Sequence, residues 1–374
     1  MAFPLIIDEF LELVQVPAHS FKERKIADVL KIKLKELGLG VEEDNAGGLI
    51  NGDCGNLIAR WPGDPGKSPL LFSAHMDRVS NPGKIVPIVK ESEDRIVSSG
   101  DTILAADDVA GIVAILDGIR RVKDGGLPHR PVEVVFSVAE EVGLLGSRNL
   151  DPSGLVSKMA YVLDTGGPFG TIVNKAPTQY TFLIRIHGKS SHAGMAPEKG
   201  LNAINVGAQA LTRIKEGRLS PVTTANYGVI SGGKATNIVC DYLEIKGEAR
   251  SHVESELKDY LAEVDRVFKG TAKERGAGCD MDLTLEYEAF DVPEDDPVIA
   301  LASGAIRALG VEPAVVGGGG GLDANYFNKF GIRAVGISTG YDKVHTEEEE
   351  QSISGLVKCG ELVARLMGSA DAQG

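Results

Sequence analysis

Five segments of the chain end in side chains that commonly bind metal ions. These side chains are His75-Met-Asp77, Asp107-Asp108, Glu140-Glu141, Asp164 and His345. Imidazole nitrogens and carboxylate oxygens are typical zinc ligands, and hydrolases with two metal ions combine several of them in one site. A lone histidine is more often structural, and two glutamates before a glycine often begin a helix. It is therefore their joint occurrence that predicts a two-metal hydrolase.

Three of these segments come after apolar runs that are typical of buried strands. The runs and the ligands that follow them are 69–74 with His75, 132–138 with Glu140, and 159–163 with Asp164. Strands that alternate with helices predict a mainly parallel α/β sheet, in which ligands gather at the carboxyl ends of the strands. We therefore expect these three side chains to lie at one edge of a sheet.

Other elements of the first half follow from local signals. The sequence Ser20-Phe-Lys-Glu23 is typical of a capping box, which predicts a helix that runs to about Leu37 and stops at Gly38. Residues 56–60 are expected to form a short strand. A helix after Asp107 would carry apolar side chains on one side, namely Val109, Ile112, Val113 and Leu116.

The pattern changes at about residue 179. The expected elements are a strand at 181–187, a helix at 201–215, strands at 227–230 and 237–250, a helix at 253–269 and a strand at 281–287. This order is that of a ferredoxin-like α+β unit. Helices at 296–309 and 352–367 and a strand at 332–337 then resume the α/β alternation. We therefore predict a catalytic domain in two parts, 1–178 and 291–374, with an inserted domain at 179–290.

The composition excludes several classes of protein. The 374 residues carry a formal net charge of −14, and no stripe of lysine and arginine could bind nucleic acid. No apolar run reaches the roughly 18 residues that a membrane helix needs, and the N-terminus lacks the features of a signal peptide. We expect a cytoplasmic protein. The four cysteines are Cys54, Cys240, Cys279 and Cys359. They form no Cys-x-x-Cys pair, which argues against disulfides and against zinc sites made of thiolates.

Six motifs in order resemble those of a known superfamily. They are His75-x-Asp77, Ala106-Asp107-Asp108-x-Ala-Gly111, Glu140-Glu141-x-Gly143, Asp164, Gly188-Lys-Ser-Ser-His192-Ala-Gly194 and His345. Over nearly its whole length the chain resembles the co-catalytic zinc peptidases, which include carboxypeptidase G, the aminoacylases, succinyl-diaminopimelate desuccinylase and peptidase T. It is most similar to the peptidase T-like branch.

The resemblance implies roles for the metal-binding residues. His75 and Asp164 would hold one zinc ion, Glu141 and His345 a second, and Asp107 would bridge the two. Cobalt or manganese could replace zinc. Asp77 would accept a hydrogen bond from the other ring nitrogen of His75, because residues two apart on a strand share a face.

The resemblance also concerns the backbone and the general base. Glu140 would take a proton from water and pass it to the leaving amine. Since consecutive strand residues point apart, Glu140 and Glu141 must lie where a strand breaks into a turn, and Gly143 permits this. A cis peptide bond is expected between Asp107 and Asp108. The relatives commonly have a lysine where this chain has Val109, so the local charge should differ while the ligands stay the same.

Three residues of the inserted domain match family positions that contact substrate. His192 would reach the active site of a partner subunit and polarise the scissile carbonyl, although a histidine at a hairpin tip is the simpler interpretation. Asn237 and Arg250 would bind the substrate carboxylate, which suits the forked guanidinium of arginine. An ordinary salt bridge within the strand is the alternative for Arg250. A homodimer that pairs through the helix at 201–215 and the strand at 227–230 is expected.

Two compositional runs have simpler explanations. The glycine run 317–321 lacks the residues of a phosphate loop, and it predicts a close backbone approach to substrate followed by a helix capped by Asp323. The alternative is a plain linker. The acidic run 347–350 is expected to form the solvent-exposed first turn of the last helix, where negative charge is favourable, rather than to contact substrate.

Together these features predict a zinc-dependent exopeptidase, an aminopeptidase that cleaves tripeptides or other short peptides. An N-acyl amino acid deacylase would use the same metal ions and Arg250 but would need a pocket for the acyl group. A peptide-binding dimer without catalytic activity is the alternative from another class. The presence of Glu140 together with all five ligands argues against it.

Overall fold

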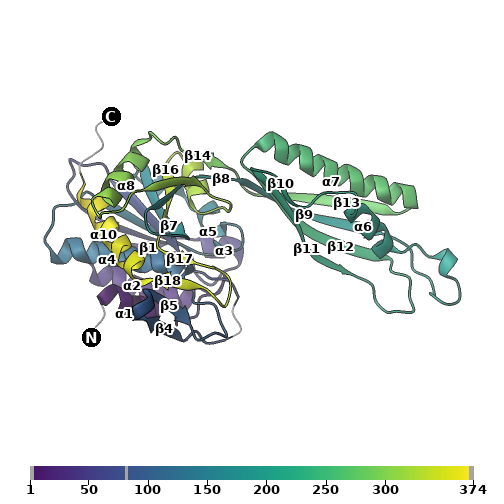
Figure 1. Ribbon diagram of the computed structural model, residues 1–374, viewed down its shortest axis with the longest axis horizontal. Coiled ribbons are helices and arrows are strands. Elements are labelled where there is room, and N and C mark those ends of the chain that lie inside the picture. The colour runs from purple at the N-terminus through teal and green to yellow at the C-terminus, as the bar shows by residue number, and fades with distance from the viewer. Residues whose placement is uncertain (1–3, 81–82, 370–374) are drawn as a thin grey trace. The chain divides into compact units, whose positions relative to one another are not determined.

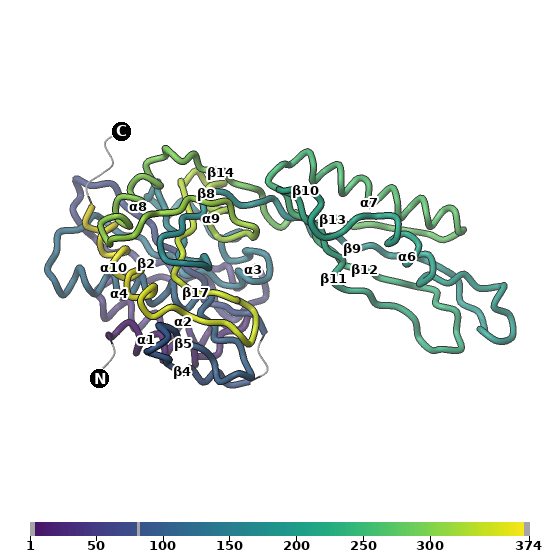
Figure 2. The backbone as a smooth tube through the Cα atoms, viewed as in Figure 1, coloured from purple at the N-terminus to yellow at the C-terminus, as the bar shows by residue number. Residues whose placement is uncertain are grey.

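A computed structural model (Figure 1) describes residues 4–80 and 83–369 of the chain. The chain divides into two compact units, each with its own hydrophobic core. Unit 1 combines Met1–Ala176 with Phe290–Gly374, and unit 2 is Pro177–Ala289. Figure 2 shows how the purple-to-blue beginning and the yellow end of the chain meet in unit 1. Ligands that are distant in sequence can therefore share one sheet.

Unit 1 is built on a mixed sheet. The strands in spatial order are β1 (Gly40–Glu43), β2 (Leu57–Trp61), β6 (Val132–Ser137), β3 (Leu70–His75), β7 (Met159–Thr165), β16 (Arg333–Ser338), β8 (Thr171–Ala176) and β14 (Phe290–Asp291), with β15 (Ala314–Gly317) also paired to β8. The central strands β6, β3, β7 and β16 are parallel, as predicted, and β1, β2 and β14 are antiparallel to their neighbours. Every residue of β3 and β6 is buried, which explains their nearly continuous apolar sequences.

Helices pack against this sheet and against one another. They are α1 (Leu5–Leu13), α2 (Arg24–Glu36), α3 (Ala46–Ile50), α4 (Ala106–Asp124), α5 (Leu145–Arg148), α8 (Pro297–Arg307), α9 (Ala324–Lys329) and α10 (Ile353–Gly368). Short 3-10 turns lie at Glu91–Glu93 and Pro152–Gly154. Helix α4 packs against β3, β7 and α10. The first residues of α4 therefore lie beside the strand ends that carry His75 and Asp164.

A small second sheet of unit 1 was not predicted. Its strands in order are β17 (Tyr341–Asp342), β18 (Glu350–Ser352), β5 (Arg95–Ser98) and β4 (Pro87–Lys90). Strand β18 pairs with β5, so the segment after His345 is tied to the segment before Asp107. This sheet brings two of the predicted metal ligands together from opposite ends of the sequence.

Unit 2 has the predicted ferredoxin-like order of elements, with one additional strand. Its antiparallel sheet runs in the order β10 (Gly217–Ser220), β11 (Thr223–Gly232), β12 (Tyr242–Ser251), β9 (Thr178–His187) and β13 (Gly278–Tyr287). Helices α6 (Ala203–Leu211) and α7 (Glu254–Arg275) share a core with the sheet, and a 3-10 turn lies at Pro197–Lys199. The additional strand is β10. The strand expected at 237–250 begins only at Tyr242, because residues 233–241 form a loop.

Two further expectations can be compared with the described residues. All four cysteines are free, as predicted, and Cys54, Cys240 and Cys359 are buried. Across 4–80 and 83–369, none of the helices has the length and apolar character that a membrane crossing requires.

Candidate metal centre

The five predicted ligands and Glu140 converge at one end of the main sheet of unit 1. His75 ends β3 and is 2% exposed. Its Nε2 atom lies 3.0 Å from Asp107 Oδ1 and 3.8 Å from Asp164 Oδ1. The ends of β3 and β7 and the start of α4 thus place an imidazole and two carboxylates close together.

Asp107 lies between two histidines. Its Oδ2 atom is 3.3 Å from His345 Nε2, while its Oδ1 atom faces His75. The same His345 nitrogen is 3.0 Å from Glu141 Oε1. The His345 side chain is 46% exposed and that of His75 is 1% exposed, so the cluster extends from the buried strand end to the surface.

The ligand atoms form two overlapping groups, each with atoms within 4.8 Å of one another. One group is His75, Asp107 and Glu141, and the other is His75, Glu140 and Asp164. Both groups contain His75, and the second contains the expected general base. The geometry therefore brings all six residues together but does not by itself separate Glu140 from the metal ligands.

The electrostatics of the cluster explain why it suits cations. Burial, followed by repulsion from Asp164, raises the pKa of Glu140 well above its usual range. Burial and the charge of Asp107 raise the pKa of Asp164 to about 8. Burial opposes ionisation of Asp107 too, but hydrogen bonds with His345 and His75 hold its pKa below the usual range. Four carboxylates beside two imidazoles are a donor set that fits two divalent ions, whose charge would relieve this repulsion.

Asp77 positions the turn that carries Glu140 and Glu141. Its carboxylate accepts the backbone N–H groups of Glu140 at 2.9 Å and Glu141 at 3.3 Å, and the hydroxyl of Ser20 at 2.7 Å. The expected contact with His75 differs in detail. His75 Nδ1 lies 2.9 Å from the backbone carbonyl oxygen of Asp77 and 3.4 Å from its carboxylate, so the carbonyl is the closer acceptor.

The Glu140–Glu141 turn departs from strand geometry, as predicted. Strand β6 ends at Ser137, and Ala139 and Gly143 have φ angles of 50° and 108°. Glu23 Oε1 accepts the N–H of Ala139 at 3.0 Å. The predicted capping box is therefore wrong, because α2 begins at Arg24 without a side-chain cap. Ser20 instead donates a hydrogen bond to Asp77, and Glu23 accepts the N–H groups of Phe21 and Ala139.

The turn before α4 is unusual in several respects. The peptide bond between Asp107 and Asp108 is cis, as predicted, and Ala105 has a φ of 61°. The Asp108 carboxylate accepts the N–H groups of His75 at 3.2 Å and Gly111 at 3.1 Å. Asp108 thus ties the start of α4 to the end of β3, and the Asp107 carboxylate is left for the cluster.

The expectation for the acidic run 347–350 is wrong in two respects. The last helix begins at Ile353 and is capped by Ser352, so the run precedes its first turn. Glu347 and Glu348 are exposed, but Glu349 is 1% exposed and accepts backbone N–H groups near Asp107. Four consecutive glutamates offer no signal in the sequence that distinguishes Glu349 from the others.

Tyr341 is a second residue that sequence reasoning missed. Its hydroxyl donates a hydrogen bond to Asp164 Oδ1 at 2.9 Å, and the residue is 2% exposed. It belongs to β17, a two-residue strand that no periodicity could have indicated. Tyr341 restrains the orientation of one predicted ligand.

The prediction that Asp323 caps the helix after the glycine run is wrong. The helix begins at Ala324, but Asp323 makes no side-chain cap hydrogen bond. Its buried carboxylate accepts the hydroxyl of Ser137, at the end of β6. Asp323 therefore links the end of the glycine run to the sheet edge that carries the cluster.

His192 and Asn237 lie together at one end of the unit 2 sheet. The N–H of Ala193 donates to the carbonyl of Asn237 at 2.9 Å, and His192 bridges to Ile238. Both side chains are exposed, and His192 Nδ1 accepts the N–H groups of Gly194 and Met195 at 3.2 Å. The imidazole is therefore accessible, which is compatible with both interpretations of His192.

Arg250 lies at the other end of the same sheet. Arg250 of β12 pairs with Gln179, near the start of β9, whereas Tyr242, the first residue of β12, pairs with His187, the last residue of β9. The bridge between His192 and Ile238 lies beyond that second end. At about 3.3 Å per residue, Tyr242 and Arg250 are about 26 Å apart. The structure thus separates Arg250 from Asn237, although both were expected to bind a carboxylate. The Arg250 guanidinium already forms two 3.0 Å hydrogen bonds with Glu248.

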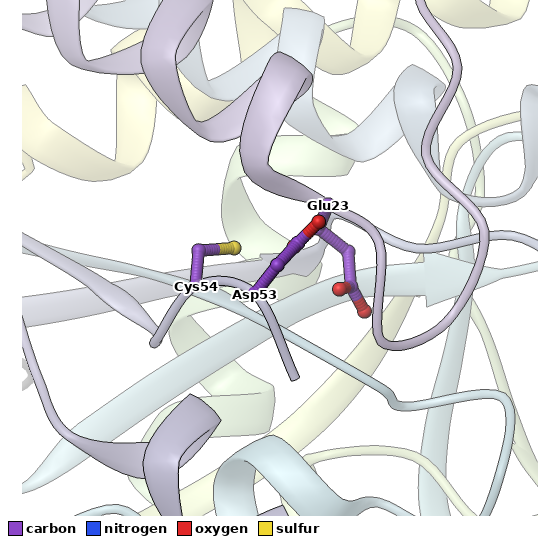
Figure 3. A group of neighbouring side chains, drawn as sticks. All are labelled: Glu23, Asp53 and Cys54. Atoms are coloured by element: carbon purple, nitrogen blue, oxygen red, sulfur yellow. The ribbon is translucent and has the colours of Figure 1, made fainter. Parts of the chain in front are cut away.

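A third group of possible ligands lies near the N-terminus of α2. Glu23, Asp53 and Cys54 have ligand atoms within 4.8 Å of one another (Figure 3). Burial raises the pKa of the Cys54 thiol to about 12, and zinc binds the thiolate. Asp53 already accepts the N–H of Arg24 at 3.0 Å, and Glu23 holds the Ala139 turn. We assign no ion to this group.

Comparisons with known proteins agree with this geometry. The family model described as peptidase dimerisation domain matches residues 179–276, and the model described as peptidase family M28 matches residues 56–170. The second range contains His75, Asp107, Glu140, Glu141 and Asp164. Both matches are to peptidase families.

Three relatives match nearly the whole chain. The aminopeptidase PepT from Bacillus cereus ATCC 10987 is 38% identical, with 97% of each chain covered and a TM-score of 0.86. A tripeptidase from Staphylococcus aureus Mu50 is 35% identical, with 97% of each chain covered and a TM-score of 0.91. The uncharacterized protein YqjE from Bacillus subtilis strain 168 is 35% identical over 98% of both chains. The chain belongs to the peptidase T-like family of peptidases.

Proposed function

We propose that this protein is a dinuclear metal-dependent aminopeptidase that cleaves tripeptides. The observation that carries the proposal is the position of Asp107, whose two carboxylate oxygens face His75 and His345 at 3.0 and 3.3 Å. A shared carboxylate between two sets of ligands is what a pair of ions about 3.5–4 Å apart requires. The similarity to an aminopeptidase PepT and a tripeptidase supports the substrate class.

The proposed ligand sets follow the resemblance. His75 and Asp164 would hold one ion, Glu141 and His345 the other, and Asp107 would bridge them. Zinc is the first choice, and cobalt and manganese are the alternatives. When bound, the ions supply Lewis acidity, which polarises a peptide carbonyl and makes water more acidic.

Glu140 is proposed as the general base, and Asp77 as the residue that holds it in place. Burial raises the pKa of Glu140 above its usual range, which is typical of a carboxylate that acts as a general base and then as a general acid. Glu140 would remove a proton from the attacking water and deliver it to the leaving amine. The two N–H groups that Asp77 accepts support the fixed orientation of the Glu140 turn.

We propose that unit 2 serves as the lid and the dimerisation domain, within the boundaries 179–290 set by the sequence. In the described chain, β10 pairs only with Thr223–Ala225, so Asn226–Gly232 of β11 has one edge without a neighbouring strand. Val229 and Ile230 on this edge are 54% and 55% exposed. An uncovered apolar strand edge suits pairing with a second copy. The match to the peptidase dimerisation domain supports a homodimer.

Substrate would be contacted from both ends of the unit 2 sheet. The exposed His192, with Asn237 beside it, would act on the site of the partner subunit and polarise the scissile carbonyl. Arg250 would bind the carboxylate of the short peptide. In this structure its guanidinium donates hydrogen bonds to the Glu248 carboxylate, which the substrate carboxylate would replace. Within one chain, His192 and Arg250 lie at opposite ends of the sheet. We therefore propose a dimer in which one subunit contributes His192 to an active site and the other contributes Arg250. We also propose that the reaction takes place in the cytoplasm, in keeping with the four free cysteines.

A substrate comparison tests the proposed function. The purified protein is reconstituted with Zn²⁺, Co²⁺ or Mn²⁺ and assayed with tri-alanine, di-alanine and N-acetyl amino acids. We expect tri-alanine to be the best substrate and chelation to abolish its cleavage. Preferred hydrolysis of N-acetyl amino acids would identify a deacylase instead. Peptide binding without hydrolysis would identify a non-catalytic binding protein.

A variant separates the base from the ligands. Glu140→Ala should lose turnover by about 10²–10⁴-fold, the usual contribution of a general base, while its metal content stays that of the wild type. Since Glu140 shares a 4.8 Å group with His75 and Asp164, loss of metal in this variant would reassign Glu140 as a ligand.

A further inference from the structure

The buried carboxylate of Glu349 is the contact that joins the two ends of the chain at the candidate metal centre. Its Oε2 atom accepts the backbone N–H groups of Leu104 at 2.7 Å and Ala105 at 2.8 Å, and its Oε1 atom accepts the N–H of Asp107 at 3.2 Å. The residue is 1% exposed. Both oxygens are thus committed to the backbone that presents the proposed bridging ligand.

The backbone that Glu349 binds would be unstable without such a partner. Ala105 has a φ of 61°, a conformation that costs a residue with a side chain about 1 kcal/mol or more. Residues 104 and 105 are buried and precede the first turn of α4, where N–H groups have no partner within the helix. A single carboxylate satisfies these donors and holds the left-handed alanine in place.

Glu349 also restrains the other side of the site. It follows His345 by four residues, and the loop between them is closed by its own hydrogen bonds: Glu349 N–H to the Thr346 carbonyl at 3.2 Å, and the Thr346 hydroxyl to the Lys343 carbonyl at 2.7 Å. His345 itself has a φ of 64°. Fixing Glu349 on the Asp107 turn therefore fixes the position of the His345 loop relative to Asp107.

The second ligand turn is held in a similar way. Ala139 has a φ of 50°, and its N–H donates to the fully buried Glu23 carboxylate, just before the pair Glu140–Glu141. At both turns a left-handed alanine next to proposed site residues is bound through its N–H by a buried glutamate from a distant segment. The repetition argues that these glutamates set the geometry of the site rather than merely fill space.

We propose that Glu349 is a positioning residue that sets the distance between Asp107 and His345 before any metal ion binds. This inference rests on the proposed metal centre. Glu349 would touch neither substrate nor ion, and it would act through the backbone of residues 104–107. Residues that orient metal ligands in this way typically contribute about 10–100-fold to metal affinity or activity.

Glu349→Gln tests the proposal, with Glu350→Gln as the matched control. The amide keeps the size of the side chain but replaces one acceptor oxygen with a donor, so it cannot satisfy both sets of N–H groups. Glu350 is adjacent, but its carboxylate pairs with Arg95 at 2.8 Å and Lys343 at 3.2 Å rather than with the Asp107 turn. The readouts are the Zn²⁺ dissociation constant, measured by competition with a chromogenic chelator, the kcat/KM on tri-alanine, and the Tm of the metal-free protein.

We expect Glu349→Gln to raise the Zn²⁺ dissociation constant by about 10–100-fold and to lower kcat/KM at limiting zinc, with partial recovery in excess zinc. The Tm of the metal-free protein should fall only slightly, because removing a buried charge offsets part of the cost of leaving a backbone N–H unpaired. Zinc affinity equal to that of Glu350→Gln, or a large fall in Tm of the metal-free variant, would overturn the proposal.

A Glu349→Gln variant that does not fold and a wild-type protein that binds no metal would have different meanings. If Glu349→Gln does not fold, Glu349→Asp is measured in the same way, since it keeps both oxygens and withdraws them by one methylene; wild-type zinc affinity in that variant, or failure to fold, would also overturn the proposal. If the wild-type protein binds no zinc, cobalt or manganese, the proposed metal centre itself fails. Wild-type binding with an unaffected Glu349→Gln would refute only the positioning role.

Discussion

Asp107 is the residue on which the proposed chemistry most depends. Its two oxygens face two different histidines, and hydrogen bonds from both hold its pKa below the usual range in spite of burial. A carboxylate that stays ionised while its neighbours Glu140 and Asp164 have raised pKa values can bridge two cations. The other carboxylates of the cluster are then available for single ions or for proton transfer.

Asp107→Asn should therefore lose the paired binding of metal ions. An amide oxygen can bind one ion, but the amide nitrogen carries no negative charge with which to bind the second. We expect metal analysis to show a single tightly held ion in place of the pair, together with loss of turnover on tri-alanine. Asp101→Asn, at an exposed position a few residues earlier, should retain both ions. Retention of the pair in Asp107→Asn would exclude the bridging role.

Glu43 should stabilise the folded protein to an extent that depends on pH. Glu43 accepts hydrogen bonds from Arg24 at 2.9 and 2.6 Å and pairs with Lys31, and these contacts, those with Arg24 first, lower its pKa to about 2. A carboxyl with a lowered pKa in the folded state stabilises the fold above its ordinary pKa of 4.5. That contribution is lost as the pH falls from about 4.5 to about 2.

The matching experiment is urea unfolding of the metal-free protein as a function of pH. Glu43→Gln should lower the free energy of unfolding by about 1–2 kcal/mol at neutral pH, allowing for partial exposure, and the difference from wild type should vanish near pH 2. Glu42→Gln serves as control, because Glu42 forms only an exposed pair with Arg60. A Glu43→Gln difference that is independent of pH would contradict the assignment.

At the scale of the elements, the site depends on how closely α4 approaches the ends of β3 and β7. A Cβ atom at Gly111 would lie 2.4 Å from the carbonyl oxygen of Leu163, the residue before Asp164, and 2.5 Å from Asp108 Oδ1. Only glycine fits there without displacing backbone. The small residue thus allows Asp107 and Asp164 to meet.

Gly111→Ala should consequently destabilise the protein by about 1–3 kcal/mol, the usual cost of overpacking, and weaken zinc binding. Gly270→Ala is the control, because Gly270 lies within α7 and a Cβ there would meet nothing within 4 Å. It should stabilise unit 2 by about 0.5–1 kcal/mol through helix propensity. Thermal and urea unfolding of both variants measure the two effects. A neutral Gly111→Ala would show that α4 can shift without cost to the site.

The elements also show what the sequence could and could not predict. Strands β3, β6 and β7 were predictable because their apolar runs end at His75, Glu140 and Asp164. The small sheet was not, since β17 and β18 contain only two and three residues and β18 pairs with β5, which is remote in sequence. The roles of Glu349 and Tyr341 depend on that sheet. They are set by tertiary pairing, and no local pattern marks them.

At the scale of the whole molecule, the proposed function would require unit 2 as well as unit 1. The sequence motifs marked Asn237 and Arg250 as candidates, but not that Asn237 lies in the loop before β12 while Arg250 lies near the end of that strand. That separation follows from strand length, and the motif spacing does not reveal it. It is the reason to propose that, in a homodimer, each active site would use unit 2 residues from two chains.

Disrupting the strand edge should test this dependence. Ile230→Lys places a charge on the uncovered edge of β11 and should shift the protein from dimer to monomer in sedimentation velocity, with loss of turnover and retention of zinc. Leu49→Lys is the control, at a similarly exposed apolar position in α3 of unit 1. A fully active Ile230→Lys monomer would contradict the role of the partner subunit.

Anomalous diffraction from crystals grown with Zn²⁺ would show whether two ions share the Asp107 carboxylate. We expect two anomalous peaks about 3.5–4 Å apart, on either side of that carboxylate, one next to His75 and the other next to His345. A zinc-soaked crystal in which the Asp107 carboxylate contacts no ion would contradict the proposed two-metal peptidase mechanism.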